Sequence, residues 1–109
     1  MFGGDGDPHR DYFIGGTQIA FTAIEGFRRQ LATELAPQSV RVVTLRTGGI
    51  PESIPGGDAS IESMIAKASP MGRAATLEDV GYAAVFAASD RARTMTAATI
   101  NISCGTLLD

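Results

Sequence analysis

Hydrophobic side chains recur every three or four residues between about Thr17 and Ala36. This spacing predicts an amphipathic helix about 30 Å long, at a rise of 1.5 Å per residue. Pro37 follows directly and cannot continue the helical hydrogen bonding. The stripe expected to face the core consists of Ala20, Ile24, Phe27, Leu31 and Leu35. The charged residues expected to lie largely off that stripe are Glu25, Arg28, Arg29 and Glu34.

Two short segments have the composition of buried strands. Residues Val40–Arg46 are rich in β-branched side chains and end at a Gly-rich loop, and Ala98–Ile102 reads ATINI between polar residues and a glycine. Runs of this kind, bounded by turn formers, are typical of strands in a parallel sheet.

Two further helices are indicated by their capping signals. Ala59–Ala68 places apolar residues on one face, and Asp58 or Ser60 is the expected N-cap. Thr76, with Asp79 three residues later, has the form of a capping box, so a third helix is expected to run to about Ser89.

The order of elements predicts an incomplete α/β sheet. Two strands joined by a helical crossover should pair in parallel with a right-handed connection if they are neighbours. Two parallel strands with three helices leave a sheet edge open, so the chain reads as part of a larger sheet. Residues 1–16 carry turn formers and are interpreted as a flexible N-terminal loop, with at most a frayed strand at the start.

Composition restricts the class of protein. The chain has 109 residues, of which 44% are hydrophobic and 19% charged, and it has no apolar run long enough to span a membrane. The net charge is −3 and no Lys/Arg cluster is present, which argues against nucleic acid as a partner. Cys104 is the only cysteine, so no internal disulfide can form and a cytoplasmic location fits best.

Other candidate sites carry little chemical signal. The acidic N-terminal residues alternate, but they lack the later Glu of a calcium loop, so no metal site is predicted. Cys104 follows a predicted strand without a basic neighbour and is interpreted as a small apolar residue. The residues considered and rejected as metal ligands are Asp5, Asp7, His9 and Asp11.

Three blocks, in this order, resemble the C-terminal half of the short-chain dehydrogenase/reductase family. They are TAIEGFRRQLATELAPQSVRVVTLRTGGI, PMGRAATLEDVGYAAVFAASD and ATINISCG, within a likeness from about Gly15 to Gly105. The resemblance implies that residues 17–109 are the C-terminal portion of a Rossmann-like, doubly wound parallel sheet. It also implies NAD(P)-dependent hydride transfer between a carbonyl and an alcohol.

The family's proton relay is missing just before the first of these blocks, in the same predicted helix. In the family a Tyr exchanges the substrate proton, and a Lys four residues later holds the nicotinamide ribose and lowers the Tyr pKa. Alignment of the IEGF motif places Thr17 and Phe21 at these two positions. An aliphatic hydroxyl does not ionise near neutral pH, and a phenyl ring supplies neither a donor nor a charge. No catalytic residue is therefore assigned.

The resemblance also implies one cofactor-binding loop. TGGIPES is similar to the loop that covers the nicotinamide, with Gly48 in place of Pro, Gly49 and Ile50 near the carboxamide, and Ser53 where a hydroxyl belongs. A plain Gly-rich turn after a strand explains the two glycines equally well. The N-terminal FGGDGD lacks the G-x-G-x-x-G spacing of a phosphate-binding turn, so NAD or NADP is implied by the family alone.

Two functional hypotheses follow. The first is a short-chain dehydrogenase/reductase-like oxidoreductase, truncated at its N-terminus, which is inactive as an isolated chain and whose family acts on small carbonyl or alcohol substrates. The second is a non-catalytic interaction or oligomerisation module, which would form a homo-oligomer or pair with another chain through an open sheet edge and an apolar helix face.

Overall fold

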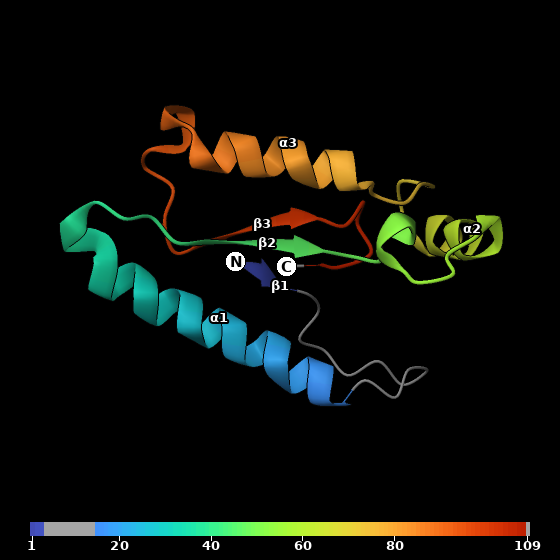
Figure 1. The fold of residues 1–109 in the computed structure, drawn as a ribbon, viewed down its shortest axis with the longest axis horizontal. Coiled ribbons are helices and arrows are strands. Elements are labelled where there is room, and N and C mark those ends of the chain that lie inside the picture. The colour runs from blue at the N-terminus through green and yellow to red at the C-terminus, as the bar shows by residue number, and fades with distance from the viewer. Residues whose placement is uncertain (4–14, 109) are drawn as a thin grey trace.

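A three-stranded parallel sheet lies between two helices. The computed structural model describes residues 1–3 and 15–108, and it is drawn in Figure 1. The strands within these residues are β1 (Phe2–Gly3), β2 (Val43–Thr47) and β3 (Ala98–Ile102). The α-helices are α1 (Gly15–Leu35), α2 (Ala59–Ala68) and α3 (Leu77–Ala88). The expected incomplete, Rossmann-like α/β architecture is confirmed.

β2 is the central strand. It pairs in parallel with β3 along its whole length, from Val43 opposite Ala98 to Thr47 opposite Ile102. It also pairs in parallel with β1, where Phe2 lies opposite Leu45. The strand expected within Val40–Arg46 therefore exists as β2, but it has a neighbour on each side and is not an edge strand. Within the described residues, the open edges belong to β1 and β3.

Segment 1–16, expected to be loop, contains β1 at its start, and α1 begins at Gly15. Residues 4–14 lie outside the described part of the chain, as do the four acidic and histidine positions considered for metal binding.

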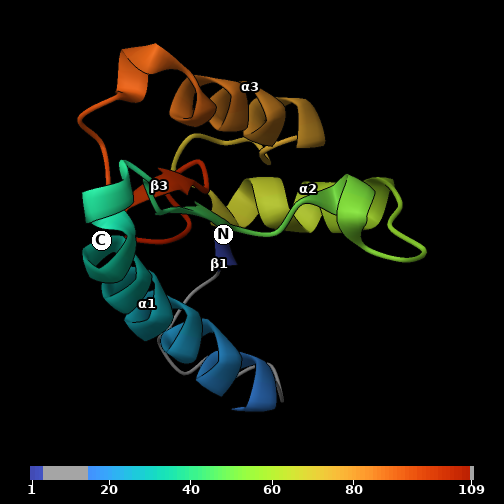
Figure 2. The same cartoon turned by 60° about the vertical axis from the view of Figure 1, so that its left-hand side comes forward.

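α1 and α3 cover opposite faces of the sheet, and α2 projects beyond the carboxyl ends of the strands (Figures 1 and 2). Side chains alternate accordingly, since Val43 and Leu45 face α3 whereas Thr44 faces Glu25 of α1.

The chain steps in one direction from β1 to β2 to β3. Because the connecting helices lie on opposite faces, the two crossovers have opposite hands. The right-handed rule holds for β1–α1–β2 and not for the connection into β3.

The apolar core lies on the α3 face. Leu45, Ile50 and Val80 are buried there, and Ala84, Ile100 and Ile102 pack against them. This small cluster joins the central strand, the loop after it and α3. It holds the loop that the sequence singles out as a candidate site.

The face that α1 turns to the sheet differs from the predicted stripe. Its buried residues are Arg28 and Ala32, whereas Phe27 is 57% exposed. The expectation that Arg28 lies off the core-facing stripe is wrong. The helix is rotated because ion pairing makes burial of Arg28 tolerable, and hydrophobic spacing alone does not reveal a buried pair.

The two capping predictions are confirmed. Asp58 caps α2 by accepting hydrogen bonds from the backbone N–H groups of Ser60 and Ile61. Thr76 and Asp79 form a complete capping box at the start of α3. These local contacts satisfy helix N-terminal donors that have no partner inside the helix.

Candidate functional site

The candidate site lies where β2 and β3 end. The loop after β2, the turn after β3 and the first turns of α1 come to this edge of the sheet, and α2 extends past it (Figure 1). Ligands in open parallel sheets bind outside the carboxyl ends of the strands. The topology therefore brings the predicted cofactor loop and the two substituted helix positions to the edge where family chemistry would take place.

Close contacts surround the two glycines of the loop. A Cβ atom added to Gly48 would collide with Oγ1 of Thr106, which donates a 2.8 Å hydrogen bond to the carbonyl of Ser103. A Cβ atom added to Gly49 would come within 3.0 Å of Cδ1 of Ile65 on α2. The glycines therefore allow the turn after β3 and α2 to pack directly on the main chain of the loop.

The rest of the loop is held by internal and capping contacts. Ile50 is buried in the core, and its carbonyl accepts hydrogen bonds from Ser53 N at 3.0 Å and Ser53 Oγ at 2.8 Å. Oε2 of Glu52 accepts a 2.6 Å hydrogen bond from the backbone N–H of Leu77, at the first turn of α3. The loop is thus anchored at both ends, and the Ser53 hydroxyl is engaged within it.

Thr17 and Phe21 lie near the start of α1, at the same end of the sheet. Thr17 is exposed and Phe21 is half-buried. Neither side chain can ionise, and a phenyl ring offers no hydrogen-bond donor. The structure therefore positions these residues at the expected edge but with side chains that cannot relay a proton.

A charged cluster between α1 and the sheet was missed by the sequence reasoning. Nη2 of Arg28 lies 2.8 Å from Oε2 of Glu25, and Nη1 donates to the carbonyl of Ala97. Oε2 of Glu25 also accepts a 3.1 Å hydrogen bond from the hydroxyl of Thr99. The sequence contained one signal for this ion pair. Glu25 and Arg28 are three residues apart, and oppositely charged residues at this spacing meet on one helix face.

The electrostatics of this cluster favour the ionised carboxylate. Burial raises the pKa of Glu25, but hydrogen bonds and the charge of Arg28 outweigh it, so the pKa lies below its ordinary value. Oε1 of Glu25 and Oγ1 of Thr44 are buried without a hydrogen-bond partner among the described residues. The cluster therefore joins α1 to β3 through Oε2 of Glu25.

Other chemistry is sparse in the part of the chain that is described. No group of three or more His, Cys, Asp or Glu side chains there could hold a metal ion. Cys104 is half-buried in the turn after β3, where its carbonyl accepts hydrogen bonds from Ser69 Oγ and Met71 N. No helix among the described residues is both long and apolar enough to cross a membrane.

Comparison with known proteins decides the family. Residues 17–106 match the family model described as enoyl-(acyl carrier protein) reductase. The chain is also 33% identical over 91 residues to the short-chain reductase protein NovJ of Streptomyces niveus, covering 76% of this chain. The chain belongs to the short-chain dehydrogenase/reductase family. It spans 35% of the length of NovJ.

Solved structures of two other proteins share the fold. A short-chain dehydrogenase/reductase from Mycobacterium ulcerans superposes with a TM-score of 0.79 and 28% identity, over 96% of this chain and 40% of that one. YwfH, an NADPH-dependent reductase involved in bacilysin biosynthesis, gives a TM-score of 0.80 at 23% identity, over 99% of this chain and 46% of its own. The described elements therefore correspond to less than half of these folds.

The short-chain dehydrogenase/reductase family implies a nicotinamide dinucleotide, and the described residues fit such a group only in part. Gly49 and Ile50 bring main chain to the carboxyl edge, which suits a carboxamide. The resemblance aligns Phe21 with the family's ribose-binding Lys, and a phenyl ring carries no ammonium group. The Ser53 hydroxyl already donates to the carbonyl of Ile50. The ribose contact and the proton relay are not provided, so no catalytic step is assigned to these residues.

Proposed function

We propose that this chain contributes the nicotinamide loop of an NAD(P)-dependent oxidoreductase site and does not catalyse oxidoreduction by itself. In this proposal residues 17–109 are the C-terminal portion of a short-chain dehydrogenase/reductase domain, and residues 1–16 precede that portion. Gly49, Ile50 and Ser53 are the cofactor-contacting residues, and the Ser53 hydroxyl, which donates to the carbonyl of Ile50, can still accept a hydrogen bond. The substrate class is a small carbonyl or alcohol, and the cell compartment is the cytoplasm.

The proposal that this chain does not catalyse oxidoreduction by itself rests on one observation. Thr17 and Phe21 occupy the helix positions at which the family places its proton donor and its ribose-binding cation. General acid catalysis requires a group that exchanges a proton near the working pH, and neither side chain does so. The anchored loop supports descent from an enzyme, because Ile50 and Glu52 fix its main chain between the core and the start of α3.

Calorimetric titration of the chain with NADH and NADPH tests this function. We expect binding weaker than about 1 mM, since pyrophosphate contacts at a helix N-terminus supply much of dinucleotide recognition. No such phosphate-binding turn stands at the start of a helix among the described residues. Micromolar binding of either cofactor, or turnover of a ketone panel, would refute the proposal.

A second function, a non-catalytic interaction module, is favoured by the exposed outer faces of the helices. On α1, Ile19 is 72% exposed and Phe27 is 57% exposed. On α3, Val85 is 71% exposed. Exposed apolar patches of this kind mark association surfaces, and the open edge of β1 adds unpaired main-chain groups.

Light scattering across a concentration series tests self-association. Phe27→Asp should lower the mass of any oligomer formed through α1 without unfolding the chain, because Phe27 is exposed. Arg29→Asp, also exposed, serves as the matched control. A monodisperse monomer at high concentration would remove the homo-oligomer from this hypothesis.

A further inference from the structure

Glu52 makes a hydrogen bond that leaves the candidate cofactor loop. Residues 51–57 turn tightly on themselves, since Gly57 N donates to Ile54 O at 2.8 Å. Their other main-chain bonds within the described part of the chain are equally local. Among the hydrogen bonds of residues 51–57 in that part, only the one from Leu77 N to Oε2 of Glu52 reaches a helix or strand.

The start of α3 is fixed without this bond. In the capping box, Oγ1 of Thr76 accepts from Asp79 N at 3.1 Å, and Oδ2 of Asp79 accepts from Thr76 N at 3.0 Å. Leu77 is the first helical residue, where an N–H has no partner inside the helix and even proline is tolerated. The Leu77 N–H is therefore a donor that the helix already holds in place and does not itself require to be bonded.

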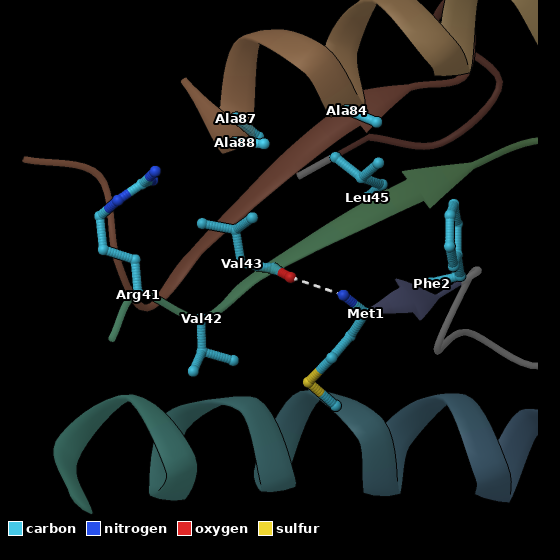
Figure 3. A pocket seen from close by; sticks show the side chains of 9 residues that line it. All are labelled: Met1, Phe2, Arg41, Val42, Val43, Leu45, Ala84, Ala87 and Ala88. Atoms are coloured by element: carbon cyan, nitrogen blue, oxygen red, sulfur yellow. Dashed lines mark hydrogen bonds between the residues drawn. The ribbon is translucent and has the colours of Figure 1, made fainter. Parts of the chain in front are cut away.

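The rest of α3 is also held in position. Its inner face packs on β2, where Ala84 lies over Leu45 in the apolar core (Figure 3). Its last turns border an apolar groove of about 460 Å³ beside Ala88. Arg41, in the wall of this groove, donates to the carbonyl of Ser89 at the end of the helix. α3 thus offers the loop a fixed point of attachment.

The segment that follows Glu52 gives the loop little support of its own. α2 has no buried residue along its ten positions, and its contact with the loop is the side chain of Ile65 beside Gly49. Left-handed glycines flank α2, with φ of 73° at Gly56 and 70° at Gly72. Ordering glycines costs more conformational entropy than ordering other residues. A bond from Glu52 to a fixed helix offsets part of this cost.

We propose that Glu52 is the residue that positions the nicotinamide loop, by joining it to the first amide of α3. The bond links residues 25 apart in sequence and closes the base of the segment that carries α2. A carboxylate acceptor makes a hydrogen bond stronger than a neutral one does, and the N-terminus of a helix favours negative charge. The inference rests on the proposed function only for the ligand of the loop, because the coupling between Glu52 and Leu77 is measured without cofactor.

Amide hydrogen exchange of the whole chain tests the coupling. Removal of the carboxylate in Glu52→Ala should let the loop open locally and accelerate exchange at the amides of Ser53, Ile54 and Gly57 by about tenfold. Exchange at Leu45 N, in the central strand, should change by less than about threefold, because the core is not altered. Unchanged exchange at the three loop amides would overturn the inference.

A matched pair of variants removes the donor instead. Leu77→Pro deletes the N–H at a position where proline suits a helix, and Thr76 already has the extended conformation that precedes proline, with φ of −107° and ψ of 164°. Leu77→Ala removes the same side chain, which is 53% exposed, and keeps the N–H. The proline variant should reproduce the faster loop exchange and the alanine variant should not. Equal loop exchange in the two would rule out this bond.

The double variant Glu52→Ala, Leu77→Pro shows whether the two residues act through each other. Its loop exchange should match that of Leu77→Pro alone, whereas additive effects would show that Glu52 acts elsewhere and would refute the coupling. Glu52→Gln keeps an acceptor and should recover part of the protection. Micromolar binding of NADH or NADPH would refute the proposed function and leave these exchange results unaffected, so the two failures are distinguishable.

Discussion

Arg28 and Glu25 form an ion pair across one turn of α1, with Nη2 and Oε2 2.8 Å apart, on the face that packs against the sheet. Arg28 is 6% exposed, and it also donates to the carbonyl of Ala97, just before β3. The pair therefore fixes the rotation of α1 and links it to the third strand.

Removing Arg28 should destabilise the fold strongly. Arg28→Ala removes the charged partner of Glu25 and the donor to the carbonyl of Ala97, and we expect a loss of about 3 kcal/mol in the free energy of unfolding. Arg29→Ala, on the exposed neighbour, should change it by less than about 0.5 kcal/mol. Urea denaturation of both variants measures the difference, and similar midpoints would show that the buried pair contributes little.

Stability should decrease in acid because of Glu25. Its folded pKa lies below the ordinary value of 4.5, so its contribution is fully present above that pH and is lost as pH falls through the folded pKa. Glu25→Gln should flatten this part of the stability profile. Some dependence should persist because hydrogen bonds from Ser60 to Asp58, and from the backbone of Thr76 to Asp79, lower those two pKa values. The test is to measure the unfolding midpoints of the unmodified chain and of Glu25→Gln from about pH 3 to pH 7. Identical pH profiles for the two proteins would show that Glu25 does not cause the loss of stability in acid.

The packing at Gly48 predicts a glycine-specific effect. Gly48→Ala should cost about 1 to 3 kcal/mol, because the new methyl group collides with the Thr106 hydroxyl. The same substitution should cost less in a Thr106→Ala background. Gly81→Ala is the control, since nothing lies near its Cβ position in α3, and it should stabilise the chain by about 0.5 to 1 kcal/mol. A neutral or stabilising effect of Gly48→Ala would contradict the close contact between this position and Thr106.

Restoring the family's side chains should not restore catalysis. The double variant Thr17→Tyr, Phe21→Lys regains a proton donor and a cation at the carboxyl edge, but the described residues offer no phosphate-binding turn at a helix N-terminus to hold pyrophosphate. Absorbance of NADPH with a panel of ketones is the assay, and circular dichroism confirms that the variant folds. Measurable turnover by the folded double variant would contradict this prediction.

Local signals in the sequence determined several elements directly. The bounds of α2 and β3 agree with prediction because each is defined by neighbouring residues, the Asp58 cap in one case and the β-branched run Ala98–Ile102 in the other. The capping box at Thr76 is equally local. The family, the α/β class and the incomplete sheet could also be inferred, since three sequence blocks in a fixed order specify them.

Tertiary structure alone decided which surfaces pack together. The burial of Arg28 depends on Glu25, Thr99 and Ala97, and Thr99 and Ala97 are separated from Arg28 by about 70 residues in sequence. β1 has two residues, too few for any periodicity, and it exists because β2 offers it main-chain partners. The groove beside Ala88 likewise arises where two strands and a helix meet. Contacts between distant segments determine these features, and hydrophobic spacing along one segment does not encode them.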